Sequence, residues 1–232
     1  MPAEVAPEAD VAAPDADVAA PDADVAAAEP IDGGIDGHRG WGLLLVVGSI
    51  VGFVAAMILT IDRFKLLTDP QVALVCDISP FVTCGPVMSS AAGALFGFPN
   101  PLLGIAGFAI AGTTGMVLLA GARLARWYLV CFELGCLAAA VFLTWLQTQS
   151  LYVIGALCIW CMCVWAVTIP IVVVTTARTL SAGAFGDGAR RVGRLIGDWK
   201  IAVIAIWYLV VITAIALRFY REFALMWFGI AL

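Results

Sequence analysis

The sequence predicts an all-α polytopic membrane protein. Hydrophobic residues occupy 63% of its 232 positions and charged residues only 12%, a composition typical of chains that cross a membrane several times. Apolar runs close to the roughly 20 residues that a helix needs to cross a bilayer recur five times. Seven cysteines accompany a single histidine, so the candidate chemistry is that of thiols.

Residues 1–40 are predicted to be a separate acidic arm on the cytoplasmic side. Three seven-residue repeats of the type Ala-Pro-Asp-Ala-Asp-Val-Ala fill residues 6–26. A proline in each repeat interrupts a helix, and low hydrophobicity with like charge favours disorder. Ten acidic side chains and one arginine give the arm a net charge of −9, whereas the rest of the chain carries +4. Neither part has the basic surface that binding to nucleic acid requires.

The five expected spans form one membrane domain over residues 41–217, followed by a short segment at 218–232. The predicted spans are Trp41–Ile61, Pro101–Gly121, Trp127–Thr148, Tyr152–Thr176 and Lys200–Leu217. Pro170 lies inside the fourth span. It should bend that helix, because proline cannot donate a hydrogen bond to the carbonyl of Ala166.

The basic residues of the short loops indicate the orientation. With a cytoplasmic N-terminus, eight basic residues lie inside and four outside. The inner set is Arg39, Arg123, Arg126, Arg178, Arg190, Arg191, Arg194 and Lys200, and the outer set is Arg63, Lys65, Arg218 and Arg221. We therefore expect a multi-pass protein of the plasma or inner membrane, with the longest loop, residues 62–100, facing the extracytoplasmic side.

A CxxC pair, Cys158 and Cys161, lies in the fourth predicted span. Residues at i and i+3 share a helix face, so the two thiols should be neighbours about two turns below the outer surface. A helix N-terminus stabilises a thiolate. Cys158, which is nearer to that end, should therefore exchange with other thiols, and Cys161 should meet an acceptor deeper in the membrane.

The outer loop contains a second pair, Cys76 and Cys84. An exposed pair in an oxidising compartment can cycle through a disulfide and exchange with a soluble protein. Asp77 should raise the pKa of the neighbouring Cys76 thiol by like-charge repulsion. After the pair, residues 86–98 are expected to form a short helix lying on the membrane surface.

The electron acceptor can be narrowed by the residue types that are missing. His38, the only histidine, precedes the first span, so no histidine-ligated haem or zinc site is expected at the CxxC pair. No glycine-rich nucleotide motif follows a strand. A quinone dissolved in the membrane is the two-electron acceptor that remains.

The order of these motifs resembles the vitamin K epoxide reductase family. The matching residues are Cys76-Asp77, Cys84, Val87, Ser89-Ser90, Asn100, Gly104 and the Cys158–Cys161 pair. The five spans resemble the bacterial branch, in a form without a fused thioredoxin-like domain, and the resemblance covers residues 41–217. It implies a four-helix transmembrane bundle around a quinone, with a peripheral fifth helix.

The resemblance also implies an activity. Bacterial members reoxidise a thioredoxin-fold, disulfide-forming protein and pass its electrons to quinone. For this chain we expect a separate secreted or membrane-anchored partner, with menaquinone or ubiquinone as the acceptor. By the same resemblance, Cys76 and Cys84 form the shuttle pair, Cys84 makes a transient disulfide with Cys158, and Cys161 passes electrons to the quinone.

Two further residues are assigned to the quinone by the resemblance. Asn100 stands where the family has an amide that donates to a quinone carbonyl. Trp165 occupies the position of a tyrosine in the animal enzymes, and its indole can stack on a ring but can only donate a hydrogen bond.

Two other functions fit the same cysteines. A membrane thiol transporter would carry reducing equivalents outward from the cytoplasm, and a non-enzymatic scaffold would use Cys76 and Cys84 only to staple its loop. The remaining cysteines, Cys131, Cys136 and Cys163, are expected to pack, the first two away from the outer site. Glu133, an intramembrane acid, has either a functional or a structural role; a structural role is favoured, because Arg126 is near enough in sequence to pair with it.

Overall fold

The computed structural model describes residues 35–74, 76–79 and 82–221, most of which are helical. The elements are α1 (Ile35–Thr68), α2 (Gly85–Ser89), α3 (Pro101–Leu119), α4 (Arg126–Thr148), α5 (Ile159–Ser181), α6 (Asp187–Asp198) and α7 (Lys200–Arg218), with a 3₁₀ turn η1 (Ala91–Ala94) and a π-helical turn η2 (Gln149–Ile154). Five of these helices are long and apolar enough to cross a membrane. The prediction of an all-α polytopic membrane protein is confirmed.

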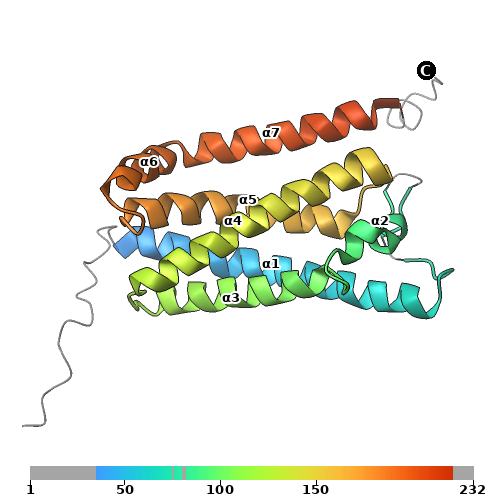
Figure 1. The fold of residues 1–232 in the computed structure, drawn as a ribbon, viewed down its shortest axis with the longest axis horizontal. Helices are drawn as coiled ribbons and strands as arrows, with labels where there is room; N and C mark the ends of the chain where they lie inside the picture. Colours follow the sequence, from blue (N-terminus) through green and yellow to red (C-terminus); the bar gives the residue numbers. More distant parts are fainter. Residues whose placement is uncertain (1–34, 75, 80–81, 222–232) are drawn as a thin grey trace, which may run out of the picture.

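Helices α1, α3, α4 and α5 form a bundle, and α7 runs along its outside (Figure 1). No side chain of α7 is fully buried. The hydroxyl of Tyr208 on α7 donates a hydrogen bond to the carbonyl of Ala166 on α5, the same carbonyl that Pro170 leaves without its helical donor. The proline gap in α5 is thus used to attach the peripheral helix.

Glycines allow α1 and α3 to lie against each other over most of their length. A Cβ atom on Gly115 of α3 would stand 2.8 Å from the carbonyl oxygen of Gly42 on α1, and one on Gly52 would stand 2.3 Å from the ring of Phe108. Helices in membranes associate through such small residues, because close backbone approach maximises packing where there is no hydrophobic driving force. This pair forms one wall of the bundle.

Helix α1 is longer than predicted. It begins at Ile35 rather than Trp41 and continues to Thr68 rather than Ile61. At 1.5 Å per residue its 34 residues span about 50 Å, against about 30 Å of hydrocarbon. Polar residues extend a helix beyond the bilayer without leaving an apolar signal, so hydropathy locates the span and not the helix ends. Residues 1–34 of the predicted arm and residues 222–232 of the predicted C-terminal segment lie outside the described residues.

The fourth predicted span is wrong at its start. Residues 149–154 continue α4 as the turn η2, and Gly155 then adopts a left-handed conformation (φ 69°) that favours glycine and ends the helix. Cys158 is extended (φ −104°, ψ 120°) and α5 begins only at Ile159. The apolar run is continuous through this break, so hydropathy does not reveal it.

The end of the bundle away from the two cysteine pairs differs from the predictions in two ways. An amphipathic helix, α6, packs against α5 there. The guanidinium of Arg126 donates to the carbonyl of Ala184 and is not the partner of Glu133. Glu133 is instead fully buried and accepts a 2.6 Å hydrogen bond from the hydroxyl of Thr176.

Candidate redox site

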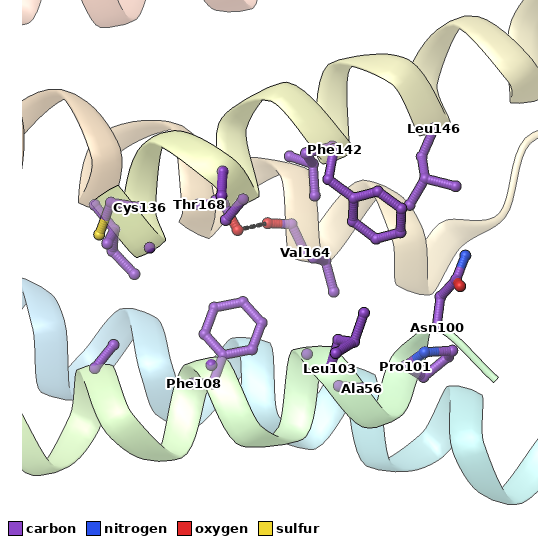
Figure 2. Close-up of a pocket in the computed structure, with 18 of the residues that line it drawn as sticks. Ala56, Asn100, Pro101, Leu103, Phe108, Cys136, Phe142, Leu146, Val164 and Thr168 are labelled. Atoms are coloured by element: carbon purple, nitrogen blue, oxygen red, sulfur yellow. Dashed lines mark hydrogen bonds between the residues drawn. The ribbon is translucent and has the colours of Figure 1, made fainter. Parts of the chain in front are cut away.

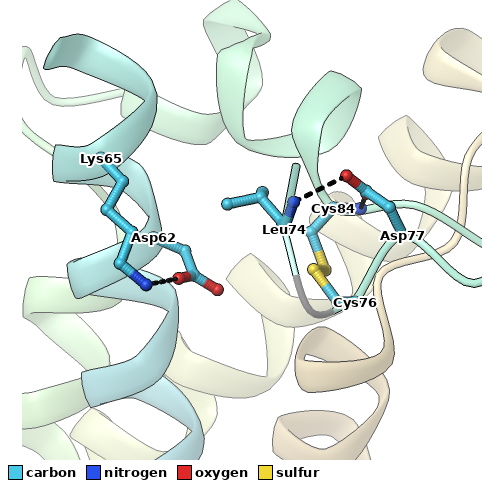
Figure 3. Close-up of polar contacts among 6 residues, drawn as sticks. All are labelled: Asp62, Lys65, Leu74, Cys76, Asp77 and Cys84. Atoms are coloured by element: carbon cyan, nitrogen blue, oxygen red, sulfur yellow. Dashed lines mark hydrogen bonds and ion pairs between the residues drawn. A yellow bond between two sulfur atoms is a disulfide. The ribbon is translucent and has the colours of Figure 1, made fainter. Parts of the chain in front are cut away.

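The loop that carries the first cysteine pair is organised by Asp77. Its carboxylate accepts hydrogen bonds from the backbone N–H of Cys84 at 3.2 Å and from that of Leu74 at 3.2 Å (Figure 3). It accepts a third from the hydroxyl of Thr83. These bonds, that of Thr83 foremost, hold the pKa of Asp77 below its ordinary value. The sequence indicated only a charge beside Cys76, whereas the structure gives this carboxylate a role in closing the loop.

Cys76 and Cys84 form a disulfide, with their Cα atoms 5.9 Å apart. Because Cys76 is disulfide-bonded, it does not titrate, and the expected effect of Asp77 on its thiol does not arise in this state. The two residues are only 1% and 0% exposed and pack against Leu59 and Met88. The prediction of an exposed pair is therefore wrong for this conformation. The apolar side chains of α1 and α2 cover the sulfur atoms.

A short backbone pairing brings the loop to the CxxC pair. The N–H of Thr83 donates to the carbonyl of Leu157 at 2.9 Å, and Val82 and Leu157 form an isolated parallel bridge. Cys84 follows Thr83 in the chain, and Cys158 follows Leu157. Cys84 and Cys158 are consequently adjacent, with their Sγ atoms 3.1 Å apart, although they are separated by 74 positions in the sequence.

Cys158 is the N-cap residue of α5 and stands one position before the membrane-spanning segment Ile159–Ser181. The thiol of Cys161, one turn later, forms a hydrogen bond with it and lowers the pKa of Cys158. The backbone N–H groups of Cys161 and Trp160 act in the same direction, and burial acts against them. These N–H groups are the free donors of a helix N-terminus.

A cavity of about 740 Å³ opens inside the bundle beside Cys161. In Figure 2, Leu103 and Phe108 of α3 face Phe142 and Leu146 of α4 across it. Small residues create the space: a Cβ atom on Gly107 of α3 or on Gly135 of α4 would meet nothing within 4 Å. The volume lies in the range of small-molecule sites, and most of its wall is hydrocarbon.

The two residues assigned to the quinone by resemblance, Asn100 and Trp165, both line this cavity and are 7% and 5% exposed. The amide of Asn100 accepts a hydrogen bond from the N–H of Leu95 at 3.1 Å and donates one to the carbonyl of Ala92 at 2.6 Å. An amide nitrogen carries two N–H groups, so one remains for a ligand. Asn100 is thereby oriented by its own turn.

Other lining residues were not predicted. Cys131 and Cys136 line the cavity, which was not predicted, and in Figure 2 Cys136 lies at the opposite end of it from Asn100. The spacing of Phe132, Cys136 and Leu143 at helical intervals could have placed them on one face. Arg63, which belongs to the outer set of basic residues, also lines the cavity. No sequence pattern distinguishes its direction from that of Lys65.

The hydrogen bonds of Asp77 predict how firmly the loop is closed. We expect Asp77→Asn to increase the rate at which tris(2-carboxyethyl)phosphine reduces the buried Cys76–Cys84 disulfide at pH 7 by about 5-fold, because charged acceptors bind N–H groups more strongly than neutral ones. Asp69→Asn, a change in the same loop, is the control, since Asp69 only accepts from the N–H of Gln71.

The same measurement has a predicted pH dependence. Because the folded-state pKa of Asp77 is lowered, its contribution is complete above the ordinary pKa of about 4 and is lost as the pH falls through the lowered value. The rates of wild type and Asp77→Asn should therefore converge below about pH 4. A difference that stays constant as the pH falls well below about 4 would contradict the assignment.

Comparison with known proteins identifies one family. The model of the Vitamin K epoxide reductase family matches residues 43–176, which include both cysteine pairs, Asn100 and Trp165. No curated protein matches the chain.

Proposed function

Because the chain belongs to the vitamin K epoxide reductase family, whose members are in general quinone-linked disulfide oxidoreductases, we propose that this protein oxidises an extracytoplasmic dithiol protein of thioredoxin fold and passes the electrons to a membrane quinone. The arrangement of the sulfur atoms carries the proposal. The Sγ atom of Cys84 in the loop disulfide lies 3.1 Å from Sγ of Cys158, and Cys161, one turn further along, lies at the cavity wall. The partner would use the product disulfide to oxidise other proteins.

The first exchange takes place at the loop. A thiolate of the partner attacks the Cys76–Cys84 disulfide, and the second thiol of the partner then resolves the mixed disulfide. The partner leaves as a disulfide, and Cys76 and Cys84 have gained two electrons and two protons. Since both sulfur atoms are buried here, the pairing between Thr83 and Leu157 must open for the partner to reach them.

The second exchange is internal. The Cys84 thiolate attacks Sγ of Cys158 in an oxidised Cys158–Cys161 pair, and Cys161 leaves as the thiolate. Cys76 then attacks Cys84 and releases Cys158, so that the loop disulfide forms again. The lowered pKa of Cys158 favours its release as a thiolate when Cys76 attacks Cys84. The arrangement described above, with a loop disulfide and two free CxxC thiols, corresponds to the product of this step.

The cavity suits a quinone, either menaquinone or ubiquinone. Its hydrocarbon wall matches an isoprenoid-bearing ring, the spare N–H of Asn100 can donate to a carbonyl oxygen, and the ring of Trp165 offers a flat surface. When bound, the quinone supplies a two-electron acceptor for the Cys158–Cys161 dithiol. The residues of this chain orient the ring, exclude water and hold Cys161 at the cavity wall.

The orientation is part of the proposal. Arginines of α6 lie at the end of the bundle opposite the cysteines, and the excess of basic residues marks the cytoplasmic side of a membrane protein. The cysteine end then faces the extracytoplasmic space of a plasma or inner membrane, where disulfides form and persist.

Purified protein in detergent tests the function. With dithiothreitol as electron donor and ubiquinone-1 as acceptor, we expect the quinone absorbance to fall by one equivalent for each dithiol oxidised. Cys158→Ala should abolish this turnover, and Cys163→Ala, a change of a cysteine outside the proposed relay, should preserve it. An absence of dithiol-dependent quinone reduction by the wild-type protein would exclude the proposed activity.

A further inference from the structure

Arg63 places a cationic group at the wall of an otherwise apolar cavity. The residue lies near the cysteine end of α1, is partly buried, and lines the cavity together with Cys161 and Asn100. Its Nε atom is buried and has no hydrogen-bond partner. A buried donor without a partner is costly and rare in folded proteins, so this group calls for an acceptor.

Neighbouring acids do not supply that acceptor. Asp62, the adjacent residue, forms a 3.0 Å ion pair with Lys65 (Figure 3), and Asp77 is engaged by its own loop. Within the described part of the chain, no carboxylate forms an ion pair with Arg63. Its charge is therefore not neutralised by a carboxylate of the described residues.

Among the described residues, the two hydroxyl groups of the cavity wall are already satisfied within the fold. The hydroxyl of Tyr128 shares a 2.5 Å hydrogen bond with that of Thr114, and the hydroxyl of Thr168 donates to the carbonyl of Val164 at 2.8 Å. Arg63 therefore differs from these groups, because it is charged and its Nε–H donates no hydrogen bond within the described residues. A guanidinium keeps its charge at every physiological pH and presents N–H groups in a fixed fork.

We propose that Arg63 donates to an oxygen of the bound quinone and offsets the negative charge that this oxygen acquires when the CxxC dithiol is oxidised. In the reaction, Cys158 and Cys161 lose two protons and two electrons and form a disulfide, and the quinone takes up both electrons and, at its two oxygens, both protons. A fixed cation in a cavity of low dielectric stabilises charge that develops before the protons arrive. The inference rests on the proposed function, and it assigns the residue that governs acceptor reduction.

Three variants separate this role from a structural one. Arg63→Gln removes the charge, Arg63→Lys keeps the charge without the fork, and Arg123→Gln changes an exposed arginine that does not line the cavity. Quinone affinity is measured in the absence of dithiol from quenching of tryptophan fluorescence by ubiquinone-1, since Trp127 and Trp165 line the cavity. Turnover with dithiothreitol then gives kcat and KM separately.

Arg63→Gln should weaken ubiquinone-1 binding by about 5-fold and lower kcat on the order of 10- to 100-fold, because the interaction strengthens as charge develops. Arg63→Lys should recover most of kcat, and Arg123→Gln should behave as wild type. Reduction of the Cys76–Cys84 disulfide by tris(2-carboxyethyl)phosphine should proceed at the wild-type rate in all three. Wild-type affinity and kcat in Arg63→Gln would overturn the inference, as would equal losses in the Lys and Gln variants.

The binding measurement also separates this inference from the proposed function. If the wild-type protein bound ubiquinone-1 but did not reduce it with dithiol, the proposed function would fail, and weaker binding by Arg63→Gln would still support the contact. If Arg63→Gln lowered only the melting temperature in detergent, Arg63 would be an interface anchor and the inference would be wrong.

Discussion

Replacing Cys161 by alanine is expected to lower dithiol-dependent quinone reduction on the order of 1000-fold or more, since the residue that faces the acceptor cannot be replaced by a neighbour. Cys161 lies at the cavity wall, whereas Cys158 is fully buried and contacts Cys84. Without Cys161, the Cys158 thiol can pair only with Cys84. We therefore expect a Cys84–Cys158 disulfide, which mass-spectrometric disulfide mapping of the purified variant would detect.

Cys163→Ala is the matched control, because it removes a thiol two residues further along the same helix and leaves the proposed relay complete. Its turnover and its disulfide map should be those of the wild-type protein. Undiminished turnover in Cys161→Ala would mean that electrons leave the protein by another route.

Replacing Cys84 by serine is expected to abolish turnover and to trap the protein partner. The Cys76 thiolate can still attack the disulfide of the oxidised partner and form a mixed disulfide, while the other sulfur of the partner leaves as a thiolate. The variant has no Cys84 thiol to resolve this adduct from the loop and none to reach Cys158. A covalent adduct through Cys76 should accumulate in cells that express the variant. Non-reducing electrophoresis followed by mass spectrometry would measure the adduct and identify the fold of the captured protein.

The double variant Cys76→Ser/Cys84→Ser controls for other cysteines, since it lacks both loop thiols and should form no adduct. A non-enzymatic protein whose loop is only stapled by the disulfide predicts no adduct in either variant. An adduct that persists in the double variant would assign partner exchange to a cysteine outside the loop.

Several features of the fold were predictable from composition and spacing alone. Five apolar runs gave five membrane-spanning helices, because a bilayer requires each crossing segment to satisfy its backbone internally. The order of Cys76, Cys84, Asn100 and the CxxC pair indicated the family that the comparison identifies over residues 43–176. Pro170 marked the carbonyl of Ala166 that the peripheral helix uses.

Helix ends were less predictable, since apolar sequence continues through the break at Gly155 and polar sequence continues the helix beyond the bilayer at both ends of α1. Hydropathy reports which solvent a residue meets, and it carries little information about backbone conformation. The position of Cys158, before α5 rather than inside it, followed from that break.

By itself, then, the sequence determined that the chain crosses the membrane as five helices and carries two cysteine pairs in a family order, because both are properties of local composition and spacing. Only the tertiary structure decided that Cys84 meets Cys158, since that contact depends on a backbone pairing at Thr83 and Leu157 between segments far apart in the chain. It likewise decided that Arg63 faces the cavity while Lys65 pairs with Asp62. The direction of a side chain at a helix end depends on the neighbouring helices, and no local pattern encodes them.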